Sequence, residues 1–236
     1  MLTKYIENYK LRKQYSKDGR VPFFKLAYNF LPQEKDAVVL DIGCGDAEFA
    51  ADASLAEEYD NLYLLDSNPE TINKLRQQYK NVMHYEAPDR LEFDDSSVDY
   101  IHLSHLVEHL EYQKLYSFMK ELDRITAPGG VLVISTPLLW WRFYNDLSHV
   151  KPYNPEVFIH YLCDEKSERS AGAISSIYTV ENLTFRYRAL PIPDGGWTSQ
   201  HLVVDVCMQI AKRITAALGF RYQEKNGYTL VLRKQS

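Results

Sequence analysis

The sequence predicts an α/β fold with a mostly parallel, seven-stranded sheet and helices on both of its faces. From residue 37 to residue 137, short apolar runs alternate with segments of helical composition. Strands that alternate with helices of about ten or more residues imply right-handed crossovers between parallel neighbours. The first run, AVVLDIG at 37–43, is apolar almost throughout, as strands buried on both faces are. At 236 residues, with 45% hydrophobic and 25% charged residues, the chain is long enough to bury a large core.

The predicted elements follow one another in a regular order. In the first part of the chain the strands are 37–43, 61–66, 81–87, 98–104 and 131–137. The helices between them are 46–59, 69–79 and 112–126. Proline stands in the first turn of the second helix, and a Pro-Gly-Gly turn follows the third. A loop with five aromatic residues follows at 137–153, and then a short helix at 154–162. The last predicted elements are a strand at 176–192, an amphipathic helix at 203–218 and a closing strand at 228–234. We expect the closing strand to be an edge or penultimate strand, and residues 1–31 to be helical with a break at Gly19 and Pro22.

Charge and cysteine content limit which partners and which cellular compartment are expected for the protein. The formal net charge is −5 and the pI is about 5.8, so a uniformly basic surface for nucleic acid is missing, although a local patch is compatible with these values. Cys44, Cys163 and Cys207 are an odd number without framework spacing, which favours a reduced, cytosolic setting. No segment reads as a signal peptide or as a membrane span.

A glycine turn follows the first predicted strand. In DIGCGD, Gly43 and Gly45 let the backbone turn tightly and approach a ligand at the carboxyl end of a buried strand. The next helix points its N-terminal amides to the same place. Asp66 ends the second strand about twenty residues on, where it can bind the two hydroxyls of a ribose. A dinucleotide fingerprint would need glycine where Glu48 stands, and Asp41 would repel a pyrophosphate but can orient the ammonium group of an amino acid.

These motifs resemble those of class I S-adenosylmethionine-dependent methyltransferases, whose first motif has the form (D/E)xGxGxG. Ala47 stands in place of the third glycine. The resemblance covers roughly residues 37–136 and extends to LYLLDSNPETI, LEFDDSSVDYIHLSHLVEHL and APGGVLVISTP, which match the regions of strands two, four and five. It implies a Rossmann-like, doubly wound fold with S-adenosylmethionine as the cofactor. We expect one domain, 1–236, with an N-terminal helical cap (1–36), a cofactor-binding core (37–136) and a substrate-side lid with the C-terminal strands (137–236).

The resemblance also implies which residues bind the cofactor. From the methionine part through the ribose to the adenine, they are Asp41, Gly43, Cys44, Gly45, Asp66, Ser67 and Asn68. Glu86 and Ala87 fall where the family often has an acid that meets the adenine amino group. Ser104 ends the fourth strand, at the edge that faces the transferred methyl group.

The segment IHLSHLVEHL gathers three histidines and a carboxylate after the fourth strand. His105, Glu108 and His109 share one face if a helix begins there. The HxxEH spacing then suits a two-histidine, one-carboxylate metal site. His149, in the loop after the fifth strand, can add a fourth ligand. His102 reads as a core or sheet-face residue.

This segment resembles the ExxEH segment of two metal-dependent groups, the small-RNA 2′-O-methyltransferases and the O-methyltransferases of ubiquinone synthesis. His105 stands where those proteins have glutamate, and three imidazoles with one carboxylate would favour Zn²⁺, Mn²⁺ or Fe²⁺ over Mg²⁺. Two alternatives need no metal. His149 or His109 can act as a general base, a contribution of roughly 10²–10⁴-fold, or the Glu-His pair can cap the following helix and line the cofactor pocket.

The substrate side follows the fifth strand. HVKPYNPEVF, at 149–158, resembles the HxKPxxPE segment of small-molecule and glycan methyltransferases. The aromatic loop suits stacking on a sugar, a quinone or a base; alternatively it packs on the sheet, where Trp140 and Trp141 cannot both face inwards. The helix at 203–218 is expected to cover the core with one apolar face, formed by Val203, Val206, Ile210, Ile214 and Leu218. A role at a partner or a membrane surface is the alternative for this helix.

We therefore expect an S-adenosylmethionine-dependent O-methyltransferase that acts on a hydroxyl of a sugar, a glycan precursor or a small metabolite. Methylation of a 2′-hydroxyl at an RNA end and a cofactor-binding scaffold without catalysis are the alternatives. Nucleic acid is a poor partner for a chain with a net charge of −5. We expect a cytoplasmic protein without a transmembrane segment, either a monomer or a homodimer.

Overall fold

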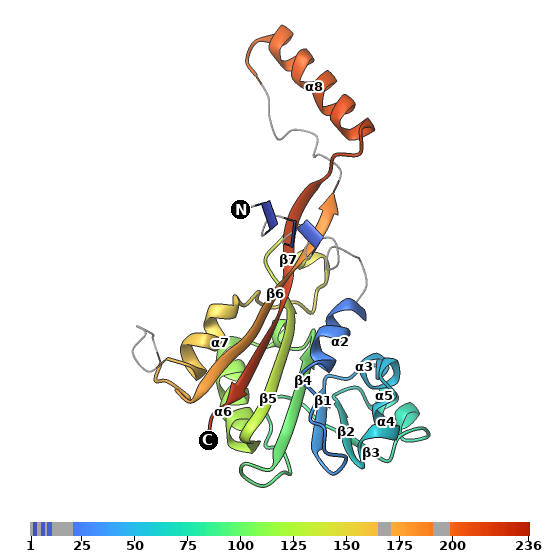
Figure 1. Cartoon of the computed structure of the whole chain (residues 1–236), viewed down its shortest axis with the longest axis vertical. Coiled ribbons are helices and arrows are strands. Elements are labelled where there is room, and N and C mark those ends of the chain that lie inside the picture. The colour runs from blue at the N-terminus through green and yellow to red at the C-terminus, as the bar shows by residue number, and fades with distance from the viewer. Residues whose placement is uncertain (1, 4–5, 8, 11–20, 165–170, 191–198) are drawn as a thin grey trace. The chain divides into compact units, whose positions relative to one another are not determined.

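The computed structural model describes every residue except 1, 4–5, 8, 11–20, 165–170 and 191–198. Within the described part, seven strands form one sheet in the order β3-β2-β1-β4-β5-β7-β6 (Figure 1). They are β1 (Val38–Ile42), β2 (Asn61–Asp66), β3 (Asn81–His84), β4 (Val98–Ser104), β5 (Thr126–Pro137), β6 (Tyr178–Leu190) and β7 (Tyr222–Lys234). The pairs from β3 to β5 are parallel, and β7 is antiparallel to β5. The predicted sheet is confirmed, and the closing strand is the penultimate one.

Helices cover both faces of the sheet (Figure 1). Those of one face are α6 (Tyr112–Ile125) and α7 (Pro155–Leu162), and those of the other are α2 (Val21–Tyr28), α3 (Glu48–Asp52), α4 (Leu55–Glu58) and α5 (Pro69–Leu75). Successive strand residues point to opposite faces. Leu40 therefore joins the core under α6, whereas its neighbour Val39 joins the core under α3. The fold is Rossmann-like and doubly wound, as expected.

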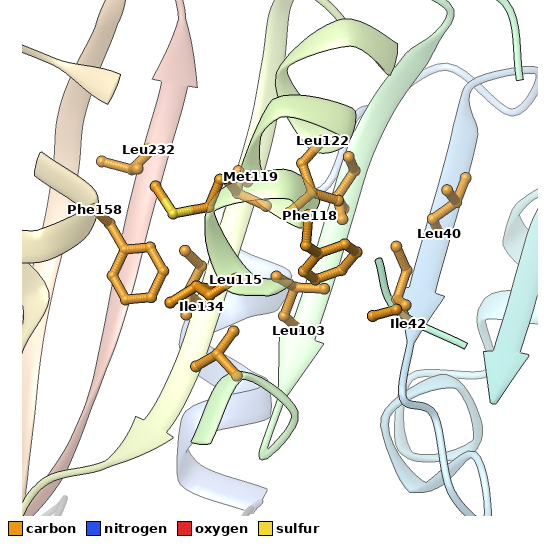
Figure 2. Packing of buried hydrophobic residues seen from close by; sticks show 14 of the residues in the cluster. Leu40, Ile42, Leu103, Leu115, Phe118, Met119, Leu122, Ile134, Phe158 and Leu232 are labelled. Carbon is orange, nitrogen blue, oxygen red and sulfur yellow. The ribbon is translucent and has the colours of Figure 1, made fainter. Parts of the chain in front are cut away.

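The core under α6 supports the strands that carry the candidate site. Leu115, Phe118 and Met119 recur at helical spacing and form one buried stripe. Figure 2 shows this stripe against Leu103 of β4 and Ile134 of β5. These apolar contacts hold the two strands beneath the loops that follow their carboxyl ends.

Three elements differ locally from the prediction. The helix expected at 46–59 is two short helices, α3 and α4, because Ser54 between them has a left-handed φ of 50°. Strand β5 starts at Thr126 instead of 131, and its pairing with β4 shifts register between Val98 and Tyr100. The Pro-Gly-Gly segment is therefore an irregularity within a strand. Its residue Gly129 has a φ of +81°, which glycine adopts without strain.

The contacts divide the chain into two compact units. The first comprises Met1–Asp18 and Arg186–Asn226, and the second comprises Gly19–Phe185 and Gly227–Ser236. The described residues of the N-terminal segment, at 2–3, 6–7 and 9–10, are helical. The predicted break at Gly19 lies outside the described residues, and Pro22 lies in the first turn of α2 instead of at a break.

The first unit contains α8 (Leu202–Ala217), which matches the amphipathic helix expected at 203–218. The helix buries none of its residues. That this helix covers the core stays a prediction. No helix of the described residues is long and apolar enough to cross a membrane.

Candidate active site

The glycine turn lies at the carboxyl end of β1, where the backbone bends towards β2. Gly43 and Gly45 have left-handed φ values of 74° and 53°, and the amide of Gly43 donates to the carbonyl of Leu65 at 2.8 Å. A Cβ at position 43 would stand 2.6 Å from Cδ1 of Leu106. The left-handed conformation therefore favours glycine there, and a side chain would also displace that of Leu106. Ala47, in place of the third glycine, is also left-handed, with a φ of 58°.

A buried contact between Asp41 and His102 lies beneath this turn. Asp41 of β1 is paired in register with His102 of β4, and Nδ1 of His102 lies 2.8 Å from Oδ1 of Asp41. The imidazole ring stacks on Phe49 with centroids 3.7 Å apart. The other carboxylate oxygen of Asp41, Oδ2, is buried without a hydrogen-bond partner. His102 is 1% exposed, which confirms the prediction of a core or sheet-face residue, and it also lines the cavity beside the turn.

Two cavities meet at the glycine turn, with Gly43 in the wall of both. The first, of about 520 Å³, is lined by Phe24, Asp41, Gly43, Cys44, Gly45, Asp46, Glu48, Phe49, His102 and Ser104. The second, of about 320 Å³, is lined by Ile42, Gly43, Asp66, Ser67, Tyr85, Glu86, Ala87, His105, Leu106, His109, Leu110 and Lys114. Nearly all of the residues predicted to bind the cofactor therefore come together at one edge of the sheet. Phe24, Phe49 and Lys114 were not predicted, because their positions depend on how the helices pack.

Asp66 organises the turn between the cavities. Its carboxylate accepts from the amide of Gly45 at 2.9 Å and from the amide of Asn68 at 2.8 Å. The side chain of Asn68 caps α5 by accepting from the amide of Glu70 at 2.9 Å. Asn68 is therefore used in capping, and it lines neither cavity.

The thiol of Cys44 lies in the wall of the first cavity. Burial raises its pKa, and the carboxylates of Asp41 and Asp66 raise it further. The thiol is therefore neutral at physiological pH and is no nucleophile there.

The histidine segment after β4 is a bend and a short 3-10 turn. His105 has a left-handed φ of 57°, the turn spans Val107–His109, and α6 begins only at Tyr112. The condition for a shared helical face is therefore not met, and the predicted helix at 112–126 is confirmed as α6. The bend nevertheless places Nδ1 of His105 3.0 Å from Oε1 of Glu108.

Glu108 is a fully buried carboxylate. Thr136, near the end of β5, donates its hydroxyl to Oε2 of Glu108 at 3.0 Å. Burial alone would raise the pKa of Glu108, but the hydrogen bond and charge of His105, with a smaller effect of His109, lower it below its usual value. The structure therefore keeps a negative charge inside the protein beside the histidines.

The loop after β5 brings His149 to His109, with ring centroids 5.0 Å apart. Nδ1 of His149 lies 2.8 Å from the carbonyl of Phe143, and Nδ1 of His109 lies 2.9 Å from the carbonyl of Ser148. A carbonyl oxygen can only accept, so each Nδ1 carries the proton and each Nε2 keeps its lone pair. The amide of Val150 donates to the carbonyl of Glu108 at 2.9 Å, which ties this loop to the turn.

The predicted four-ligand set is brought together only in part. Among the described residues, Glu108, His109 and His149 offer ligand atoms that all lie within 4.8 Å of one another. His105 lies outside this group and contacts Glu108 instead. In the loop, Phe143 is buried against His149, whereas Trp141 is 61% and Tyr144 60% exposed. Trp140 and Trp141 do not both face inwards, as predicted.

A glycine turn, an acid at the end of β2 and a polar cluster at the end of β4 define a class I S-adenosylmethionine-dependent methyltransferase when they meet on this sheet. A family model described as a methyltransferase domain matches residues 15–184, more than half of the chain. The chain belongs to this family. It is an enzyme, and S-adenosylmethionine is its cofactor.

Similar proteins agree with this assignment. A probable S-adenosylmethionine-dependent methyltransferase of Mycolicibacterium smegmatis is 30% identical over 132 residues, which are 56% of this chain and 46% of that protein. The chain thus spans about half the length of this curated relative. A methyltransferase structure from Archaeoglobus fulgidus covers 96% of this chain and 99% of its own, with a TM-score of 0.58 at 20% identity. The geranyl diphosphate C-methyltransferase of Streptomyces coelicolor covers 92% and 78%, with a TM-score of 0.58 at 12% identity. The two solved structures share the fold.

Replacing Asp66 with alanine should weaken S-adenosylmethionine binding by about 10–100-fold, because hydrogen bonds to a charged group contribute ~1.5–3 kcal/mol. Isothermal titration calorimetry measures the change. Asp60→Ala is the matched control, since Asp60 is exposed and precedes the other end of the same strand. Equal affinities in the two variants would remove Asp66 from the binding site.

Proposed function

We propose that this enzyme transfers the methyl group of S-adenosylmethionine to a hydroxyl oxygen of a sugar, a glycan precursor or a small metabolite. The observation that carries the proposal is the pair of imidazoles, His109 and His149. Each has Nδ1 anchored on a backbone carbonyl, and the pair stands beside the buried carboxylate of Glu108. A hydroxyl acceptor needs a base of this kind to remove its proton, because a neutral hydroxyl is a weak nucleophile, whereas a deprotonated acceptor needs none.

The residues around the glycine turn fit the cofactor. Oδ2 of Asp41, buried and without a hydrogen-bond partner, suits the ammonium group of the methionine part. The left-handed Gly43 and Gly45 leave room for the backbone to approach a ligand, and Asp66 suits the ribose hydroxyls. The bound cofactor supplies an electrophilic methyl group on a positively charged sulfur.

His149 is the general base in this proposal. The acceptor hydroxyl, a weak nucleophile at neutral pH, gives its proton to Nε2 of His149 as its oxygen takes the methyl group. The bond from Nδ1 to Phe143 holds the ring in the tautomer that can accept this proton. The charge of Glu108 stabilises the imidazolium that forms, and His109 lies beside it to share the proton.

The cluster fits a divalent metal as well as a proton. The ligand atoms of Glu108, His109 and His149 all lie within 4.8 Å of one another. Oε2 of Glu108 accepts a hydrogen bond from Thr136, whereas the buried Oε1 makes only the ion-pair contact with Nδ1 of His105. Were a metal bound, Glu108, His109 and His149 would hold it, and it would acidify a coordinated hydroxyl.

A metal measurement separates the two mechanisms. We expect turnover to be unchanged by a chelator and by added Zn²⁺ or Mn²⁺, because the base needs no ion. Elemental analysis of tag-free protein, purified without chelator, accompanies the assay. About one divalent ion per chain, absent from His109→Gln and required for turnover, would replace the base mechanism with a metal mechanism.

The loop between Pro137 and His149 supports a sugar-like acceptor. Trp141 and Tyr144 are exposed on this loop, and Arg142 lies 4.3 Å from the Trp141 ring. Aromatic faces beside a charged group suit the mixed apolar and polar faces of a sugar. The loop ends at the base itself, so an acceptor held by these rings lies near His149.

An acceptor panel tests the reaction. Tritium transfer from labelled S-adenosylmethionine is measured with mono- and oligosaccharides, nucleotide sugars, hydroxylated metabolites and RNA oligonucleotides. We expect turnover on a polyhydroxylated acceptor and a product that survives strong alkali, since methyl ethers resist it and methyl esters do not. Label that is lost to alkali as methanol, or transfer confined to nitrogen or carbon, would overturn the proposal. Transfer to RNA alone would identify the 2′-hydroxyl alternative.

A further inference from the structure

Helix α8 presents a continuous apolar face to solvent. Its exposed residues recur at helical spacing and have exposed fractions between 47% and 78%. We call them the apolar strip; they are Leu202, Val203, Val206, Ile210, Ile214 and Leu218. Phe220 and Tyr222, just beyond the helix, are also exposed. An exposed strip of this length marks an interaction surface.

The charge of the unit that contains α8 is opposite to that of the rest of the chain. Met1–Asp18 and Arg186–Asn226 together carry eleven Lys and Arg against five Asp and Glu, a formal charge of +6. The remaining residues carry sixteen Lys and Arg against 27 Asp and Glu, a formal charge of −11. The net charge of −5 hides this division, which favours a negatively charged partner for the first unit.

We propose that α8 binds the surface of an anionic lipid bilayer, with the apolar strip in the acyl region and the basic residues on and just after the helix at the headgroups. At 16 residues the helix is about 24 Å long, shorter than the ~30 Å hydrocarbon core. It therefore lies in the plane of the interface. Lys212 and Arg213 stand on the helix, and Arg221 follows it and donates to the carbonyls of Ala216 and Phe220. Long basic side chains beside an apolar face can extend to lipid phosphates.

The apolar strip and the charge together select this partner over two others. A second copy would bring another unit of charge +6 against the first, so repulsion would oppose the contact. RNA would satisfy the charge, but the strip consists of aliphatic side chains, which neither stack on bases nor bond to phosphates. A bilayer with acidic headgroups satisfies both features. This inference is independent of the methyl acceptor.

Vesicle sedimentation with the full chain tests the proposal. We expect binding to phosphatidylcholine vesicles that contain about 30 mol% phosphatidylglycerol to be at least about tenfold tighter than binding to phosphatidylcholine alone. Raising the salt concentration from roughly 0.05 to 0.5 M should weaken this binding.

The double variant Ile210→Ser/Ile214→Ser removes apolar area and should weaken vesicle binding about tenfold or more. Lys212→Gln/Arg213→Gln should weaken binding to the anionic vesicles only, and the control Gln209→Ser, outside the strip, should bind as the parent does.

Four other results would overturn the proposal, and each would assign a different role to the apolar strip. Absence of vesicle binding, or equal binding by Ile210→Ser/Ile214→Ser, removes the membrane role of the strip. Binding of single-stranded RNA without vesicle binding indicates a nucleic-acid surface. A homodimer that dissociates in the double serine variant, without vesicle binding, assigns the strip to a second copy. A lower thermal midpoint or lost S-adenosylmethionine affinity in that variant shows that the strip packs within the chain.

Discussion

His149→Ala is expected to lower turnover by ~10²–10⁴-fold, the usual contribution of a general base, with little change in affinity for S-adenosylmethionine. Affinity should persist because His149 lines neither of the two cavities at the glycine turn. Its ring instead faces His109 and Phe143 on the neighbouring loop. Single-turnover kinetics with saturating cofactor give the rate, and calorimetry gives the affinity.

A second variant distinguishes two roles of His149, that of a general base and that of a residue that only holds the loop in place. The side-chain amide of His149→Asn can take the place of Nδ1 and donate to the carbonyl of Phe143, 2.8 Å from Nδ1 in the structure. It offers nothing in place of Nε2. If His149 is the base, Asn and Ala lose turnover alike. Turnover restored by Asn would show that the residue only positions the loop, and His160→Ala, exposed on α7, controls for the loss of a histidine.

The sheet could be predicted because its signals are local. Buried parallel strands read as apolar runs, such as VVLDI and NLYLLD, and each βα turn carries its own glycine, proline or aspartate. The carboxyl ends of parallel strands meet at one edge. Residues as distant as Gly43 and Glu86 therefore line one cavity, as the resemblance implied.

The details that were missed depend on contacts between segments distant in sequence. HxxEH has helical spacing, but the left-handed His105 donates its amide to the carbonyl of Ser135, so the segment continues the contact with β5 and does not form a helix. The role of His102 requires the register between β1 and β4, which no single strand encodes. The amphipathic pattern of α8 likewise predicts that one face of the helix is apolar, but it does not predict what covers that face.

Replacing His102 with phenylalanine should destabilise the protein by about 3 kcal/mol, the upper end for a hydrogen bond to a charged group. Phenylalanine keeps a ring beside Phe49 but donates no hydrogen bond to Asp41. A buried charge then stands without its partner. Chemical denaturation without cofactor measures the loss, and Phe24→Leu, which also alters the packing around His102, reports how much of it arises from packing alone.

The double variant Asp41→Leu/His102→Phe tests whether the pair serves cofactor binding or stability. With both polar partners replaced by apolar side chains, no buried charge remains, and most of the lost stability should return. Affinity for S-adenosylmethionine should be lost nevertheless, because the carboxylate of Asp41, which lines the cavity and has its Oδ2 without a partner, is gone. A stable protein that still binds the cofactor would show that the pair is structural. A double variant as unstable as His102→Phe would show that the cost arises from the shape of the site instead of from an unpaired charge. The expected outcome assigns His102 to orient the carboxylate of Asp41 for the ammonium group, at little net gain in stability.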